Sequence, residues 1–345
     1  EAVFTVDEEV GMDGAFALDC SDLKGRRLLN LDSEMEGVFT VSCAGGMRSD
    51  CFFPAALTPA EGMDVCKLTI SGLQGGHSGA DIHLGRGSAN RLMGRVLCAA
   101  LEKFPGLRLA AIDGGEFDNV ICSRCEATVA LPAGKGEAFA AFARELDAAL
   151  KNEYAVTDPG VALECVPSSA DRAVSPERTA VLLRALAVLP HGVEAMDTDF
   201  PGLVQTSLNM GVVRLDDAGL HVTFSIRSSI ASRKEMLAQR VRAAAELAGG
   251  TVTERGVYPG WQYRRDSQFR ETLLAAYKDL TGKDGVVEAT HGGLECGLFM
   301  EKLPGLDAVS LGPDIPDIHS VRERLGVSSV ARTYALVCEV LRRSV

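Results

Sequence analysis

The sequence has little of what marks a membrane protein or a nucleic-acid-binding protein. Its 345 residues contain no apolar run of about 20 residues, the length that spans a bilayer, so we expect no membrane partner. Its 47 acidic residues outnumber 35 basic ones, which gives a net charge of -12. Because proteins that bind phosphate backbones carry a basic face, this balance argues against nucleic acid as a partner and leaves small cationic or zwitterionic ligands.

The sequence also lacks a paired cysteine framework. Among its 10 cysteines, only Cys122 and Cys125 lie at a short spacing, and a zinc ribbon or finger needs a second such pair. The other cysteines are scattered through expected strands and helices, which is typical of reduced thiols in a cytoplasmic protein. We therefore expect a cytoplasmic location.

The pattern of apolar residues predicts an α/β protein with two domains. Alternating strands and helices at both ends of the chain predict a mostly parallel sheet covered by helices. Two rounds of helix and antiparallel strand between them predict an inserted, internally duplicated α+β domain. The expected helices are 88–103, 137–151, 176–189, 233–247, 267–280 and 327–343, and the expected strands include 64–71, 127–131, 205–215, 220–228, 286–289 and 307–311.

Acidic residues stand directly after the apolar run Ala2–Val6, which predicts a strand. An unpaired buried charge is costly, so a cation is expected beside Glu8 and Glu9. Neighbouring strand residues face opposite ways, so these two acids can share a site only at a strand end or in a turn, where Gly11 supplies the break. One carboxylate would then bind a metal and the other would act as general base. A solvated acidic loop is the alternative.

Two further candidate ligands lie far apart in the sequence. Asp32 follows the expected strand Leu28–Leu31, at the carboxyl end where α/β sheets bind ligands. His319 lies in a proline-rich loop beside acids, and neutral imidazole is a good zinc ligand. A turn acid and a surface histidine are the alternatives.

A glycine-rich segment surrounds His77. Glycines on both sides let the backbone and the imidazole approach a ligand closely, and Ser78 or Asp81 could orient the ring. An incidental histidine in a glycine-rich turn is the alternative.

A second glycine-rich turn and an arginine predict a place for a carboxylate. Gly292 and Gly293 join a strand to a helix, and their N–H groups make a cradle for a substrate oxygen. Arg227 ends an expected strand and could bind a carboxylate, with Asn209 on the preceding strand. The alternatives are a surface ion pair for Arg227 and a helix-dipole acid for Glu295.

Taken together, these segments resemble the aminoacyl-histidine dipeptidases, within the di-zinc exopeptidases that include carnosinases and aminoacylases. The resemblance implies a partial three-layer zinc-exopeptidase catalytic domain, residues 1–46 and 258–345, interrupted by an inserted α+β lid domain, residues 47–257. The matching segments run in order along the whole chain: FTVDEEVGMDGA, LLNLDSEMEG, GLQGGHSGADIHLGRGSANRL, THGGLECGLF and SLGPDIPDIHSVRERL.

The resemblance also implies roles for the acidic residues and His319. Glu8 would be the general base, Glu9 and His319 would bind one zinc, and Asp32 would bind the other. The family's His-x-Asp motif and bridging Asp, which precede the DEEVG segment, have no counterpart here. Since the chain also starts without an initiator methionine, we expect a piece of a longer protein that is inactive alone.

On the lid domain, the resemblance implies a substrate-binding surface. His77 would polarise the scissile carbonyl, Asn209 and Arg227 would hold the terminal carboxylate, and Gly292 with Gly293 would line the pocket. The implied reaction is hydrolysis of Xaa-His or similarly small dipeptides. An N-acyl amino acid acylase on the same scaffold and a non-catalytic binding module are the alternatives, and a homodimer is left open.

Overall fold

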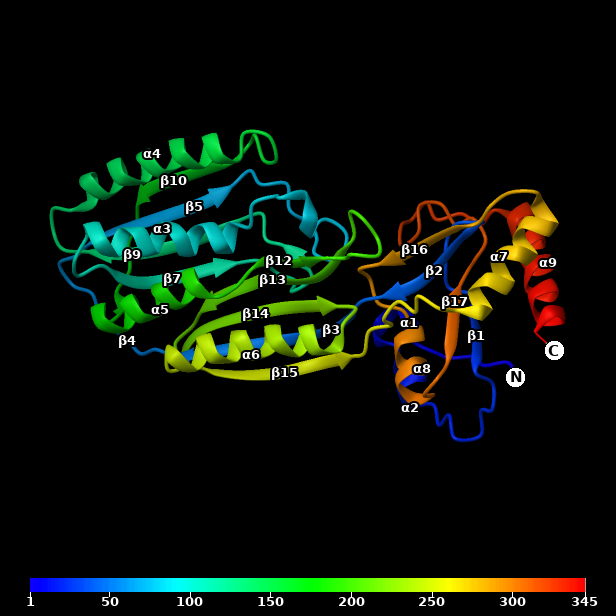
Figure 1. The fold of residues 1–345 in the computed structure, drawn as a ribbon. Coiled ribbons are helices and arrows are strands. Elements are labelled where there is room, and N and C mark those ends of the chain that lie inside the picture. The colour runs from blue at the N-terminus through cyan, green and yellow to red at the C-terminus, as the bar shows by residue number, and fades with distance from the viewer. Residues whose placement is uncertain (345) are drawn as a thin grey trace.

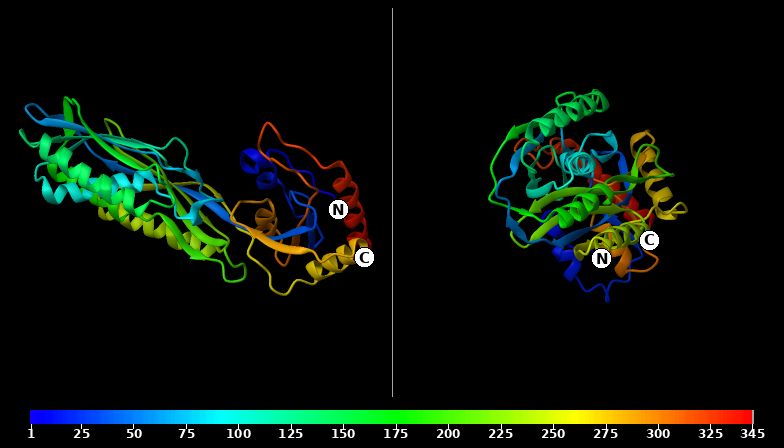
Figure 2. Two further views of the ribbon diagram at one scale, coloured as in Figure 1. Left: turned by 90° about the horizontal axis from the view of Figure 1, so that it is seen from above. Right: turned by 90° about the vertical axis from the view of Figure 1, so that its left-hand side faces the viewer.

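The computed structural model describes residues 1–344, which form two lobes (Figures 1 and 2). The first lobe contains both chain ends and a four-stranded sheet with the order β1-β17-β2-β16. β1 pairs with β17 and β2 with β16 in parallel, whereas β17 meets β2 antiparallel at one residue pair. The expected mostly parallel sheet is therefore confirmed, apart from this contact. Its strands are β1 (Arg27–Asn30), β2 (Val38–Cys43), β16 (Val286–Thr290) and β17 (Asp307–Ser310).

Helices cover both faces of this sheet, giving three layers (Figure 1). One side carries α7 (Gln268–Thr281) and α9 (Val327–Arg343). The other side carries α8 (Cys296–Lys302) with the short helices α1 (Glu8–Gly11) and α2 (Asp13–Ala17). None of the helices within residues 1–344 is long and apolar enough to cross a bilayer.

The strand expected over residues 2–6 is wrong. Residues 1–7 form no helix or strand, and the Phe4 side chain is 92% exposed. An apolar run becomes a strand only where another strand can accept its backbone hydrogen bonds, and no strand within residues 1–344 pairs with this run.

The second lobe is built on a nine-stranded sheet with four long helices that share its hydrophobic core. The eight strands of the main path run β10-β5-β9-β7-β13-β14-β3-β15, and β12 pairs with β13. The strands are β3 (Gly45–Pro54), β5 (Asp64–Ser71), β7 (Arg108–Gly114), β9 (Cys125–Leu131), β10 (Ala162–Pro167), β12 (Gly192–Met196), β13 (Val204–Leu215), β14 (Gly219–Ser228) and β15 (Thr251–Tyr258), and the helices are α3 (Ala89–Lys103), α4 (Gly136–Glu153), α5 (Pro176–Val188) and α6 (Ala231–Leu247).

The same order of elements occurs twice in this lobe, as the expected duplication requires. One unit is β5-α3-β7-β9-α4-β10, and it lies between β3 and α5 of the other unit, β3-α5-β13-β14-α6-β15. The units meet where β7 pairs antiparallel with β13. Smaller elements lie outside this scheme: β4 (Leu57–Pro59) with β11 (Arg172–Val174), β6 (Gly76–His77) with β8 (Val120–Ile121), and the 3-10 turn Ile82–Leu84.

Local sequence signals explain where the long helices begin and end. Ser175 precedes α5 and its hydroxyl accepts the Arg178 N–H, with Pro176 at the first helical position. Ser267 caps α7 in the same way, and α7 ends at Gly282 in a left-handed conformation. These signals place both helices within two residues of the ranges that the sequence predicts.

A buried lysine joins the two chain crossings between the lobes. The Lys234 ammonium donates to the Gly46 carbonyl at 3.4 Å and to the Tyr258 carbonyl at 2.5 Å. Beside them, Cys43 and Trp261 exchange backbone hydrogen bonds of 3.0 Å. These hydrogen bonds tie both crossings to each other and to α6.

Candidate functional site

A cleft of about 1000 Å³ lies between the two lobes and brings together most of the residues singled out in the sequence. Acids and His319 line it from the three-layer lobe, and arginines with His77 line it from the lid lobe. Its lining includes Glu8, Glu9, Asp32, Glu34, Arg48, His77, Asp118, Arg227, Arg255, Tyr258, Gly292, Gly293 and His319. The two walls therefore have opposite charge.

Glu8 and Glu9 occupy the first turn of the four-residue helix α1, so of the two expected positions, a strand end or a turn, the structure has the turn. The chain reverses on both sides of this turn because Asp7 and Met12 adopt left-handed conformations, with φ of 59° and 62°. The Met12 N–H donates to the Asp7 carbonyl at 2.8 Å and closes the turn. A single helical turn thus presents both carboxylates to the cleft.

Burial and neighbouring carboxylates raise the pKa of two acids of this wall, Glu8 and Asp32. Burial raises the pKa of Glu8 to about 7, and the neighbouring Asp32, Glu9 and Glu295 carboxylates add to the rise. Asp32 keeps contact with solvent, yet surrounding protein and then Glu9 and Glu295 raise its pKa to about 6. His319 acts in the opposite direction on both groups. This wall has excess negative charge that a bound cation would relieve.

His319 contacts Glu9, and both side chains line the cleft. Its Nε2 lies 3.0 Å from a Glu9 carboxylate oxygen, and its backbone has φ of 59°. The His319 N–H donates to the Glu323 carboxylate at 3.0 Å, which holds the strained loop. Within residues 1–344, no group of three or more His, Cys, Asp or Glu side chains is close enough to hold a metal.

Glu295 is a member of the acidic wall that the sequence analysis treated only as a helix-dipole acid. Its side chain is 6% exposed, one carboxylate oxygen accepts the Thr5 hydroxyl at 2.9 Å, and the other has no partner. The sequence shows the acids Asp7–Glu9 and the turn that contains Glu295 as separate motifs, and the fold brings Glu295 close to Glu8.

His77 is held at the cleft by the small ribbon of β6 and β8. The Asp81 carboxylate accepts the backbone N–H of His77 at 2.9 Å, so it holds the main chain rather than the imidazole ring. Partial burial and the nearby Arg227 lower the pKa of His77, which favours the neutral imidazole at neutral pH. A Cβ at Gly79 would lie 2.9 Å from the imidazole Cε1 of His77, so any larger residue at position 79 would crowd the ring.

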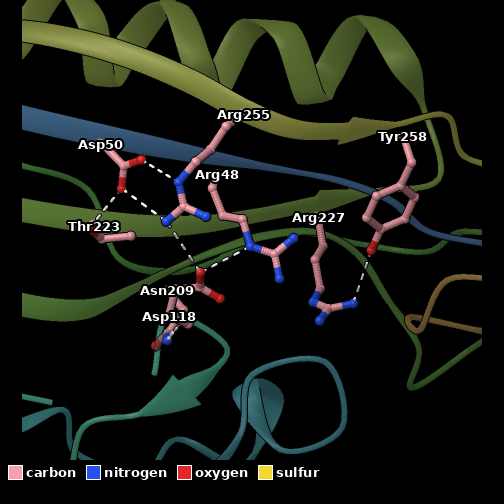
Figure 3. Close-up of polar contacts among 8 residues, drawn as sticks. All are labelled: Arg48, Asp50, Asp118, Asn209, Thr223, Arg227, Arg255 and Tyr258. Carbon is pink, nitrogen blue, oxygen red and sulfur yellow. Dashed lines mark hydrogen bonds and ion pairs between the residues drawn. The ribbon is translucent and has the colours of Figure 1, made fainter. Parts of the chain in front are cut away.

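Arg227 is the arginine of the lid wall without a carboxylate partner within residues 1–344. Its Nε is buried without a partner, and its Nη1 lies 3.5 Å from the Tyr258 hydroxyl (Figure 3). By contrast, Arg48 donates to Asp118 at 2.9 Å. A half-buried guanidinium that lines the cleft and has no counterion is a ready site for a substrate carboxylate.

The lid wall continues as a polar network on the helix-free face of the sheet (Figure 3). Arg255 donates to Asp50 at 2.5 Å, and Thr223 donates to the same carboxylate at 2.8 Å. Arg255 also lies 3.8 Å from Asp118. These pairs neutralise each other, so Arg227 carries the uncompensated charge of this wall.

Asn209 does not face the cleft with free donors. Its side chain is 1% exposed, and its amide nitrogen donates to the carbonyls of Asp118 and Val120, both at 2.8 Å. The Gly292 N–H is also used, because it donates to the Thr290 hydroxyl at 3.0 Å. Of the expected carboxylate-binding groups, Arg227 therefore has the contacts that fit such a role best.

The His291 side chain forms a contact between the two lobes, and the sequence predicted no role for it. Its Nε2 lies 2.8 Å from the Ser207 hydroxyl of β13, and its Nδ1 is buried without a partner. Burial and the nearby Arg227 lower its pKa to about 3, so the ring is neutral. The contact between His291 and Ser207 therefore joins the two lobes.

The chain is similar in sequence and in fold to known peptidases. The family model of the M20 peptidase dimerisation domain matches residues 68–158. Cytosol non-specific dipeptidase of Escherichia coli (strain K12) is 36% identical over 345 residues, covering 99% of this chain and 71% of that protein. The crystal structure of aminoacylhistidine dipeptidase from Vibrio alginolyticus matches with a TM-score of 0.91 and 36% identity, covering 98% of this chain and 69% of that one.

Proposed function

Because the chain belongs to the M20 family of peptidases, we propose that it is a metal-dependent dipeptidase that hydrolyses the peptide bond of Xaa-His and similarly small dipeptides. The observation that carries the proposal is the cleft with an acidic wall facing His77 and an unpaired Arg227. The names of both relatives support a dipeptide substrate. A dipeptide carries an ammonium and a carboxylate at its two ends, which matches the two walls of the cleft.

Glu8 is the general base in this proposal. Its carboxylate lines the cleft, where it would take a proton from an attacking water and return that proton to the leaving amine. The water oxygen bonds to the carbonyl carbon, and the carbon–nitrogen bond breaks as the amine is protonated. The neighbouring Glu9 remains with His319 and leaves Glu8 free for this role.

The lid residues bind and orient the dipeptide. His77, with a lowered pKa, donates a hydrogen bond to the carbonyl oxygen as negative charge develops there. Arg227 holds the terminal carboxylate, and the turn of Gly292 and Gly293 lines the pocket beside it. Asn209 was expected to share the carboxylate, but its donors are already used.

The acidic wall supplies ligand types that suit zinc or a similar divalent cation, although no group of three within residues 1–344 is close enough to hold one. Glu9 and His319 would hold one ion and Asp32 would contribute to a second, since carboxylate and neutral imidazole are good zinc ligands. The raised pKa values of Glu8 and Asp32, to which neighbouring carboxylates contribute, support a cation at this place. When bound, such an ion polarises the carbonyl and makes water more acidic.

The test is hydrolysis by the natural gene product, with residues 1–345 expressed alone beside it. We expect zinc-dependent release of histidine from glycyl-histidine and β-alanyl-histidine. Cleavage of N-acetyl-histidine without cleavage of these dipeptides would replace the proposal with an acylase. Binding of dipeptides without turnover at any metal concentration would indicate a non-catalytic binding module.

We further propose that the lid lobe is where a second copy of the chain would associate. The matched dimerisation domain is the unit containing α3 and α4, and its strand β7 already pairs with β13 of the same chain. A homodimer would therefore use another surface of this lobe. Sedimentation equilibrium distinguishes a monomer from a dimer, and a monomer at micromolar concentration would contradict this proposal. The E. coli relative is named a cytosol dipeptidase, which supports a cytoplasmic location here.

A further inference from the structure

Asn209 holds a short segment of the lid at both of its ends. This segment, Asp118–Val120, leads into strand β8. The two Asn209 amide hydrogens are donated to the carbonyls of Asp118 and Val120, each at 2.8 Å. Asn209 belongs to β13 in one repeat unit and the segment belongs to the other, so the contact crosses the boundary between the units (Figure 3).

The same segment forms the support of His77. His77 pairs with Val120 in the β6–β8 ribbon, and the Ser78 N–H donates to the Asn119 carbonyl at 2.8 Å. His77 and its neighbour are therefore attached to the segment that Asn209 fixes. The Asn209 side chain is thus connected to the backbone of His77 through the segment Asp118–Val120.

The direction of the Asn209 amide is determined by its partners. Both acceptors are carbonyl oxygens, so the NH₂ group must face them and the side-chain oxygen must face away. That oxygen is buried without a partner, and it cannot donate to a carboxylate. Binding the substrate carboxylate would require Asn209 to give up one or both of these hydrogen bonds, which is costly.

We propose that Asn209 is a positioning residue that holds His77 over the cleft through the segment Asp118–Val120. The inference deepens the proposed dipeptidase function, since it concerns the residue that would polarise the scissile carbonyl. A second contact supports it: a Cβ at Gly211 would lie 2.5 Å from the Asp118 Cα and carbonyl oxygen. The segment is thus packed directly on β13, with no room for a side chain at that point.

The kinetic test separates positioning from substrate binding. Asn209→Ala and Asn209→Asp in the natural gene product should lower kcat by about 10- to 100-fold with little change in KM, because a small displacement of a catalytic group costs about this much. The double variant His77→Ala/Asn209→Ala should be no slower than His77→Ala by more than about 3-fold. A raised KM with unchanged kcat would show that Asn209 binds the carboxylate, and would overturn the proposal.

A measurement without turnover tests the same inference in residues 1–345. Hydrogen–deuterium exchange should become faster in segments 76–79 and 118–121 of Asn209→Ala, with the remaining sheet unchanged. Gly211→Ala, which displaces the segment without touching Asn209, should show the same local pattern. The matched control is Gln205→Ala, since Gln205 is a buried amide on the same strand whose side-chain oxygen has no partner.

These outcomes distinguish the inference from the proposed function. Unchanged exchange around His77 in Asn209→Ala would overturn the inference whether or not the protein cleaves dipeptides. Absence of dipeptide cleavage by the unaltered natural product would overturn the function and leave the exchange result to decide the positioning role.

Discussion

His319 and Glu9 lie 3.0 Å apart, although they come from near the two ends of the chain. One follows strand β17 in a long loop, and the other sits in the single-turn helix α1. Both residues belong to the acidic wall of the cleft, which lies opposite the lid residues. The inserted lid thus faces an acidic wall to which the first and last parts of the sequence contribute.

Replacing His77 tests its proposed role directly. His77→Ala in the natural gene product should lower kcat by about 10²- to 10³-fold, because losing one donor to a developing oxyanion typically costs that much. The zinc content, measured by mass spectrometry of the metal, should stay the same. Loss of metal in this variant would mean that His77 is a ligand.

Replacing Arg227 should chiefly raise KM. A charge-assisted contact with the substrate carboxylate contributes about 1.5–3 kcal/mol, so Arg227→Ala should weaken binding by the corresponding factor. Amidation of the dipeptide's carboxyl terminus should have the same effect on the unaltered enzyme. Equal cleavage of the amide and the free acid would rule out this role.

Tyr258 should strengthen the binding of the substrate carboxylate by Arg227. Its ring lies against the backbone at Gly46 and Gly293, and its hydroxyl lies 3.5 Å from Arg227 Nη1. Removing one hydrogen bond in Tyr258→Phe should raise KM by about 2- to 10-fold. The effect should vanish with the amidated dipeptide, and the control Tyr263→Phe should leave KM unchanged. An equal KM increase for the amide would separate Tyr258 from carboxylate binding.

Periodicity predicted the lid lobe well, because its helices and strands bury one face each. The expected helix 176–189 and strand 220–228 match α5 and β14 to within one residue at each end. The run Ala2–Val6 shows the limit of that reasoning, since alternation alone does not supply a partner strand. Without that strand, Glu8 and Glu9 lie in a helical turn, the other position that their adjacency allowed.

Sequence motifs identified most residues of the cleft, but not what each contacts. Asn209 was selected because it precedes Arg227, yet its partners lie 89 and 91 residues away in the sequence. Glu295 looked like an ordinary acid at a helix start, and only its burial beside Glu8 and Asp32 gives it weight. Burial and long-range hydrogen bonds depend on the tertiary fold, which no local pattern specifies.

His191 should make the lid lobe less stable at acidic pH. Its Nδ1 accepts the Met210 N–H at 3.0 Å, and burial, with a smaller effect from Arg91, lowers its pKa to about 4. The unfolded state, with a pKa near 6.5, takes up a proton first, so stability is lost as pH falls from about 6.5 to about 4 and then stays level. The loss from this residue is at most about 3 kcal/mol.

Urea unfolding at several pH values measures that loss. His191→Gln keeps an acceptor for the Met210 N–H but cannot titrate, so its stability should vary less between pH 6.5 and 4 than that of the unaltered chain. His291 contributes in the same direction in both proteins, since its pKa is also lowered. The exposed His83 provides the control, and a pH dependence in His191→Gln as steep as in His83→Gln would contradict the assignment.

Residues 1–345 expressed alone should bind divalent metal weakly. A catalytic zinc usually has three protein ligands, whereas residues 1–344 contain no group of three, and Glu9 with His319 supplies two. We therefore expect less than one zinc per chain after equilibrium dialysis, further loss in His319→Ala, and no measurable cleavage of glycyl-histidine. Residues 47–257 should remain folded when expressed separately, because they contain their own core. Binding of two zinc ions per chain together with dipeptide cleavage would refute this prediction and would require ligands other than Glu9, Asp32 and His319.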